Sequence, residues 1–178
     1  MATSRPREPD IVEGIVDDVR RLYPGLDVIG LPITGRVLRL SRYIEGLREE
    51  RLAEFDLTVP DYDVLATMRR KAGDGTINVR DLQESMMLSS GGTTKRLDRL
   101  QTRHLIERLP DPNDRRGVLI RLTEEGIELV DAAIPAITRL ENELVGSVLS
   151  AQGRNEVANG LHTMLFARER PEEEVTDA

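Results

Sequence analysis

The sequence predicts a mainly α-helical protein with one short β-hairpin. Three observations support this fold class. Apolar residues recur every three or four positions along most of the chain, which is the spacing of helices that bury one face. Between 106 and 122 the pattern changes to two alternating runs around the turn sequence DPNDRRG, as in a hairpin. The length of 178 residues suits one domain with extensions.

Residues 11–56 are predicted to hold two helices, behind a disordered arm over 1–10. The first helix, over 11–22, is short and amphipathic, and its apolar residues are Ile11, Ile15, Val19 and Leu22. The second spans about 33–55 and follows a heptad-like seam, made of Ile33, Val37, Leu40, Ile44, Leu47, Leu52 and Phe55. Such a seam indicates a helix that pairs with another helix.

Three helices and the hairpin are predicted over residues 57–123. Thr58 and Asp61 have the spacing of a capping box at the start of the first helix. Asn78 is the expected N-cap of the second helix, and the third runs to about Arg103. Two short helices joined by a tight link and followed by a hairpin form a winged helix-turn-helix.

Residues 124–170 are predicted to form two further helices, ahead of a disordered acidic tail over 171–178. Thr123 and the two acids after it mark the start of a long helix. A last amphipathic helix carries Val157, Leu161, Met164 and Leu165. A small winged-helix core cannot bury this stripe and the seam at 33–55. Two copies of the chain can bury them mutually, which predicts a homodimer.

Composition excludes several classes of function. With no cysteine, the chain has no disulfide, thiolate metal site or cysteine nucleophile. The two histidines, His104 and His162, are isolated, which argues against a metal site or a His-dependent triad. We therefore expect a protein that is not an enzyme and needs no cofactor. Without a leader or a long apolar run, it is expected to be cytoplasmic.

The charge is distributed unevenly. Residues 69–121 hold twelve Arg and Lys against seven Asp and Glu, so this block is about +5 in a chain of net charge −7. The remainder is therefore about −12. A basic face on an acidic body is expected of a nucleic-acid-binding protein, although chance clustering on a solvated surface gives the same count.

Residues 88–126, LSSGGTTKRLDRLQTRHLIERLPDPNDRRGVLIRLTEEG, resemble the MarR family of bacterial transcriptional regulators. The resemblance extends over about 33–168. It implies a homodimer with intertwined terminal helices, expected to act as a repressor. Each protomer then carries a winged helix-turn-helix, and the pair reads a palindromic operator in double-stranded DNA. Half-site centres should lie about one DNA turn (roughly 34–36 Å) apart.

The third helix of this unit is the expected recognition helix. Its small, hydroxyl and basic residues are the predicted DNA contacts: Ser89, Ser90, Gly91, Gly92, Thr93, Thr94, Lys95 and Arg99. The two glycines cost about 1 kcal/mol each relative to alanine. Close approach to DNA explains that cost, and so does a frayed helix start. For Lys95 and Arg99 the alternative to DNA contact is an exposed salt bridge.

The hairpin tip supplies further predicted DNA contacts. Arg115 and Arg116 are expected to project towards the minor groove, where negative potential is concentrated. Asp114 is expected to fix the guanidinium of a neighbouring arginine. In the family, the Asp and the second Arg of this motif have these roles, and they fall here on Asp114 and Arg116.

Within the family, the chain is most similar to the subgroup of PecS and the urate-responsive regulators. That resemblance implies a ligand site at Asp63, Arg96 and Arg108. The subgroup's tryptophan is absent, so a purine lacks its stacking platform, and a small di- or tricarboxylate fits two arginines better. The alternative is that Asp63 simply forms a salt bridge with Arg96. An anion competing for Arg96 would then release DNA.

Two other functions remain open at this point. One is a winged helix that binds protein instead of DNA, although such a module does not require a basic helix next to an Arg-tipped wing. The other is a DNA-binding protein that responds to no ligand.

Overall fold

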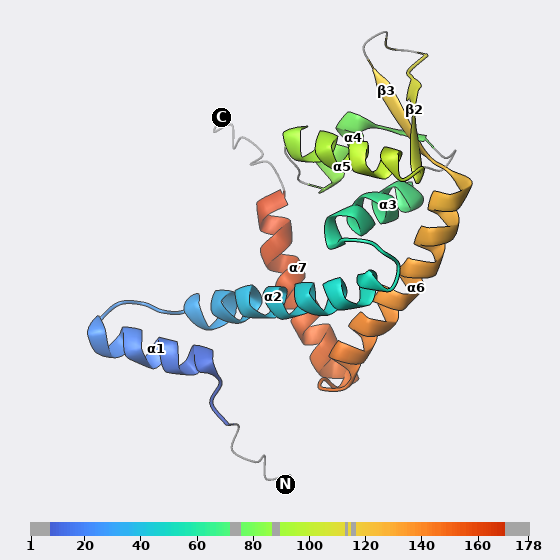
Figure 1. The fold of residues 1–178 in the computed structure, drawn as a ribbon. Coiled ribbons are helices and arrows are strands. Elements are labelled where there is room, and N and C mark those ends of the chain that lie inside the picture. The colour runs from blue at the N-terminus through green and yellow to red at the C-terminus, as the bar shows by residue number, and fades with distance from the viewer. Residues whose placement is uncertain (1–7, 72–75, 87–89, 113, 115–116, 170–178) are drawn as a thin grey trace, which may run out of the picture.

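A computed structural model describes residues 8–71, 76–86, 90–112, 114 and 117–169. This part of the chain forms the predicted mainly helical fold with a β-wing (Figure 1). Its elements are α1 (Ile11–Leu22), α2 (Leu31–Ala53), α3 (Val59–Lys71), β1 (Thr76–Asn78), α4 (Val79–Met86), α5 (Ser90–Thr102), β2 (Ile106–Pro110), β3 (Val118–Leu122), α6 (Glu124–Gly146) and α7 (Ala151–Glu169). No helix within the described residues is long and apolar enough to cross a membrane.

Helices α3, α4 and α5 and the small sheet share one apolar core. Its fully buried side chains come from every one of these elements except β1 and include Leu65, Leu82, Leu97, Leu100 and Ile120. Leu52 at the end of α2 and Val130 and Ile137 of α6 close this core from the side. The hairpin β2–β3 extends beyond the helices as a wing (Figure 1).

The sheet has three strands in the order β1-β3-β2, one more than the predicted hairpin. β1 pairs antiparallel with β3, with Ile77 opposite Ile120. Its last residue, Asn78, is also the predicted cap of α4, because its Oδ1 accepts a hydrogen bond from Asp81 N at 2.7 Å. The extra strand therefore fixes the start of α4 to the wing.

The corner between α5 and β2 is held by the start of α6. His104 adopts a left-handed backbone with φ 58°, and Leu105 N donates to Leu100 O at 3.0 Å, which ends α5. Thr123, the predicted cap of α6, accepts from Gly126 N at 3.0 Å. The same hydroxyl donates to His104 O at 2.6 Å. One threonine thus joins the recognition helix, the wing and α6.

Helix α1 packs on α2 through a different face from the predicted one. Val12 and Val16 are buried, whereas Ile11 and Ile15 of the predicted stripe are exposed. The reason lies at Gly35 of α2, where an added Cβ would lie 3.0 Å from a methyl group of Val12. The absence of a side chain at Gly35 therefore lets Val12 pack closely on α2. At the same end, Arg36 Nε donates to Asp10 Oδ2 at 2.8 Å and lowers the pKa of that carboxyl.

A broad apolar surface remains open on the helical arms. The N-terminal half of α2 exposes apolar side chains of its seam: Ile33, Val37 and Leu40. α7 has no buried residue and exposes Val157, Leu161, Met164, Leu165 and Phe166. The two helices that were expected to need a partner are therefore the ones left uncovered in a single chain.

Candidate DNA-binding surface and ligand pocket

The first half of α5 carries the predicted DNA contacts. Thr94 and Lys95 are exposed, and Gly91 and Gly92 lie in the first turn of the helix. Thr93 differs from the prediction of a DNA contact, because its side chain is fully buried. It stands four and seven residues before Leu97 and Leu100, so helical periodicity places it on the core-facing side. Ser89 lies outside the described residues, as does the side chain of Ser90.

Arg99, also predicted to contact DNA, is bound to α3. Its Nε donates to both carboxylate oxygens of Asp61, at 3.1 and 2.9 Å, and its Nη2 donates to Oδ1 as well. Nη2 also reaches Thr58 Oγ1 at 3.4 Å. Asp61 is only 1% exposed, so this is a bidentate ion pair with a buried carboxylate. The predicted alternative of a salt bridge at Arg99 is therefore present, with its acid in the core.

Two more arginines tie α5 to its neighbours. Arg103 Nη1 donates to Asp56 O at 2.6 Å, at the left-handed turn between α2 and α3. On the other flank, Arg108 of β2 donates to Asp98 at 2.6 Å and to Gln101 at 2.7 Å. The second half of α5 is thus attached both to α3 and to the wing.

The wing turn is closed by Gly117. Its N–H donates to Asp114 O at 2.9 Å, and its carbonyl accepts from Asp111 N at 3.2 Å. A Cβ at Gly117 would lie 2.8 Å from that of Asp111, so the turn needs glycine. Asp114 is exposed. Arg115 and Arg116 lie outside the described residues, and the expected buttress between Asp114 and Arg116 stays a prediction.

The three predicted ligand residues do not meet. Asp63 pairs with Arg48 of α2, with Nη2 to Oδ1 at 2.7 Å, and not with Arg96. Arg108 is engaged by Asp98 at the base of the wing. Arg96 is half-buried, and no ion pair joins it to another described residue. The bridge expected between α3 and α5 does exist, but Asp61 and Arg99 form it.

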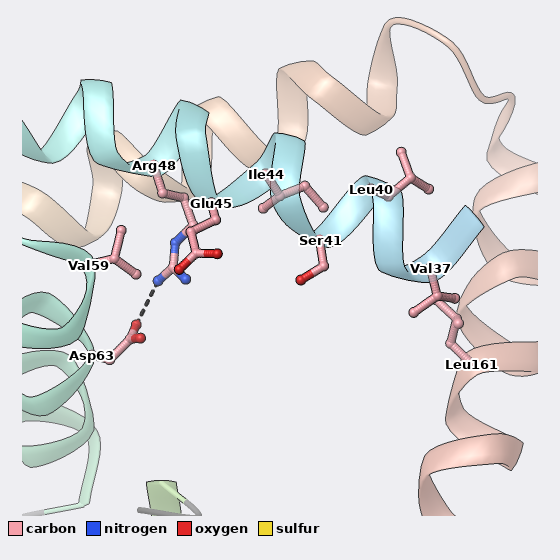
Figure 2. Close-up of a pocket in the computed structure, with 9 residues that line it drawn as sticks. All are labelled: Val37, Leu40, Ser41, Ile44, Glu45, Arg48, Val59, Asp63 and Leu161. Carbon is pink, nitrogen blue, oxygen red and sulfur yellow. Dashed lines mark hydrogen bonds and ion pairs between the residues drawn. The ribbon is translucent and has the colours of Figure 1, made fainter. Parts of the chain in front are cut away.

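Asp63 does line a pocket, of about 490 Å³, between α2, α3 and α7 (Figure 2). Apolar side chains form most of its wall: Val37, Leu40, Ile44, Val59 and Leu161. Arg48, Glu45 and Asp63 make its charged end. Such a pocket suits a small molecule with an apolar body and one charged group.

Arg48 is the functional candidate that the sequence reasoning missed. Its guanidinium carbon Cζ lies 5.3 Å from the centroid of the Tyr62 ring. Its Nε is buried and has no hydrogen-bond partner among the described residues. Burial raises the pKa of the Tyr62 phenol above its usual 10.0, so the ring stays neutral under the guanidinium at pH 7. A signal was present in the sequence, because Arg48 interrupts the i, i+4 apolar series between Ile44 and Leu52.

The fold, with α5 beside the wing, defines the class of protein to which this chain belongs. Helices α4 and α5, packed on α3 and followed by a β-wing, make the chain a winged helix-turn-helix protein. The profile of the MarR family matches residues 57–118. The HTH-type transcriptional regulator PecS of Dickeya dadantii is 32% identical over 132 residues, 74% of this chain and 78% of that protein. The chain belongs to the MarR family of transcriptional regulators, which are not enzymes.

Other relatives agree with this assignment. The multiple antibiotic resistance protein MarR of Salmonella typhimurium is 32% identical over 101 residues, 57% of this chain and 68% of that protein. A cysteine-to-serine mutant of E. coli MarR, solved with operator DNA, has a TM-score of 0.67 at 29% identity, over 79% of this chain and 99% of that one. AbsC of Streptomyces coelicolor, at 23% identity over 83% and 100% of the two chains, supports the fold alone, with a TM-score of 0.73.

Proposed function

We propose that this chain is a homodimeric repressor that binds a palindromic operator through α5 and the wing, and that a small anion releases it. One observation carries the DNA-binding part. Exposed Lys95 stands on the outer side of α5, which Arg99 and, just beyond its end, Arg103 hold in place through ion pairs. The solved complex of the E. coli relative with operator DNA supports the same use of this fold.

The uncovered faces of α2 and α7 support the homodimer. Two protomers that bury these faces around a two-fold axis would present two copies of α5 on one side of the assembly. The operator would then have matching two-fold symmetry. The alternative of a protein-binding winged helix predicts no preference for such a sequence.

Lys95→Ala and Arg116→Ala should each weaken binding to a palindromic duplex selected from random sequences, the second severely, without unfolding the dimer. If each contacts one phosphate per protomer, each substitution removes two contacts from the dimer and should also reduce the slope of log K against log salt by about 1.8. Fluorescence anisotropy over a salt series measures both quantities. Arg20→Ala, on exposed α1, is the matched control and should change neither.

Two results would contradict the proposed surface. One is that wild-type protein binds a scrambled duplex as tightly as the palindrome, which favours the protein-binding alternative. The other is unchanged affinity in Arg116→Ala, which would remove the wing from the interface.

The proposed effector site is the pocket at Arg48 and Asp63. The charged end of this pocket holds one arginine and two acids, and Glu141 Oε1 lies 3.7 Å from Arg48 Nε, so an anion must take Arg48 from Asp63 to bind. Loss of that 2.7 Å ion pair would loosen the contact between α2 and α3. Helix α5 and the wing would then change position relative to α2. The two copies of α5 in the dimer would no longer match a fixed operator spacing.

The apolar wall adds a requirement that the anion have an apolar portion. Val37, Leu40 and Leu161 of this wall also lie on the faces proposed to pair, so in the dimer the pocket would be bounded by the interface.

Citrate, the class of anion expected from the sequence, and benzoate, which has the apolar body that this pocket favours, are the probes for this site and are tested separately. A probe that binds at a hundred times its Kd should stabilise the fold by about 2.7 kcal/mol and raise the melting temperature by several degrees. We expect Arg48→Gln to lose this shift and Arg108→Ala to keep it. The reverse pattern would move the site to the residues predicted from the sequence. If neither probe shifts melting or releases DNA, release by these anions is refuted.

A further inference from the structure

We propose that Asp61 is the residue that positions the recognition helix for DNA, acting through Arg99, and that Arg99 itself is not a DNA contact. This inference rests on the proposed use of α5 as the reading helix. The sequence suggests that Arg99 contacts DNA and that Asp61 only caps α3. Here Arg99 serves instead to hold α5, and Asp61 is the acid that fixes Arg99.

The buried position of Asp61 strengthens its hold on Arg99. Asp61 is 1% exposed and lies in a core of apolar side chains, where a lone carboxylate is strongly disfavoured. Arg99 compensates it with its guanidinium fork, which also reaches Thr58 Oγ1. Moving Arg99 to a phosphate would leave Asp61 without its charge partner. The ion pair therefore holds Arg99 more firmly than an exposed pair would.

The position of Arg99 on α5 lets its ion pair fix the rotation of the helix. Asp98 and Arg99 are adjacent, so their side chains leave α5 about 100° apart. Asp98 is tied to Arg108 of β2, and Arg99 to Asp61 of α3. These ties on two flanks resist rotation of α5 about its own axis. Lys95, one turn earlier than Arg99, is thereby held at a fixed angle on the exposed side.

The two ion pairs that flank α5 differ in their exposure to solvent. Asp98 is 58% exposed, so its pair with Arg108 is screened by solvent and salt. Asp61 is buried, so its ion pair with Arg99 is screened less. Thr58, just before α3, accepts a hydrogen bond from Asp61 N at 3.3 Å and gives Arg99 a second point of attachment. The angle of the reading helix is therefore set from the α3 side.

The test uses one selected operator duplex and the full chain in five forms: wild type, Lys95→Ala, Arg99→Ala, Asp61→Asn and the double variant of the last two. Anisotropy is measured over a salt series. We expect Arg99→Ala and Asp61→Asn each to lower affinity about tenfold with an unchanged salt slope, whereas Lys95→Ala, which removes one contact from each protomer, reduces the slope by about 1.8. The double variant should bind no worse than either single variant, because both remove one interaction.

Arg99→Lys separates positioning from charge. A lysine keeps a phosphate contact but lacks the planar fork that holds two carboxylate oxygens. We therefore expect Arg99→Lys to recover little of the affinity lost in Arg99→Ala. It also keeps a cation near Asp61, so it serves as the test if Asp61→Asn fails to fold by circular dichroism.

Two groups of results overturn the inference. Tighter DNA binding by Asp61→Asn, a reduced salt slope in Arg99→Ala or full recovery by Arg99→Lys would each show that Arg99 contacts the phosphates. In that case Lys95→Ala still weakens binding, and the proposed reading surface stands. Unchanged affinity and slope in Lys95→Ala and Arg99→Ala alike would instead refute α5 as the reading helix, and this inference with it.

Discussion

Gly126→Ala is expected to destabilise the protein severely. An added Cβ at this buried position, in the first turn of α6, would lie 2.0 Å from the carbonyl oxygen of Leu105. That oxygen cannot move freely, because it accepts the hydrogen bond from Thr123 N at 3.1 Å. Alanine gains about 1 kcal/mol in helix propensity. The clash with backbone should outweigh this gain and cost about 3 kcal/mol or more.

Thermal unfolding at fixed protein concentration measures this effect. A loss of about 3 kcal/mol should lower the melting temperature by roughly 6–12 °C in a chain of this length. Gly14→Ala is the matched control, because Gly14 is an exposed helical glycine with nothing within 4 Å of an added Cβ. It should be neutral or slightly stabilising. Equal melting temperatures for both variants would show that α6 can shift away from Leu105 at little cost.

The same corner shows what the sequence predicts well. Caps and periodicity are local properties, so Thr123 at α6, Asn78 at α4 and the hairpin strands were found from sequence alone. β1 was missed because three residues beside a glycine-rich loop are too few to show alternation. Whether such a segment becomes a strand depends on its pairing with β3, which lies more than forty residues away.

The sequence predicts less well which residues of one helix face which neighbouring helix. Asp61 and Asp63 are two residues apart, so they point to nearly opposite sides of α3. Periodicity gives this separation, but it does not say which acid faces α5. The packing of α3 turns Asp61 to Arg99 and Asp63 to Arg48 of α2. α1 is a similar case, since the sequence shows the stripe of Ile11 and Ile15, but Val12 and Val16 pack on α2 because Gly35 leaves room for Val12.

Leu165→Glu is expected to dissociate the proposed homodimer and abolish tight operator binding. Leu165 is 56% exposed on α7 and lies on the same side as Val157 and Leu161. Because Leu165 is already about half covered, its burial in the interface contributes about 1–2 kcal/mol, and two-fold symmetry doubles this contribution per dimer. Losing it raises the dissociation constant of the dimer by about thirtyfold to a thousandfold. A buried glutamate adds a further cost.

Sedimentation velocity over a concentration range tests this prediction, with DNA binding measured in parallel. Thr163→Glu is the matched control, because Thr163 is exposed on the opposite side of α7 from Leu161. It adds the same charge to the same helix and should leave a dimer. A monomer of Leu165→Glu that still folds should bind only half-sites, weakly, because one protomer brings one reading helix. If Leu165→Glu sediments as wild type does, the exposed stripe of α7 does not form the dimer interface, and the apolar face of α2 must pair without it.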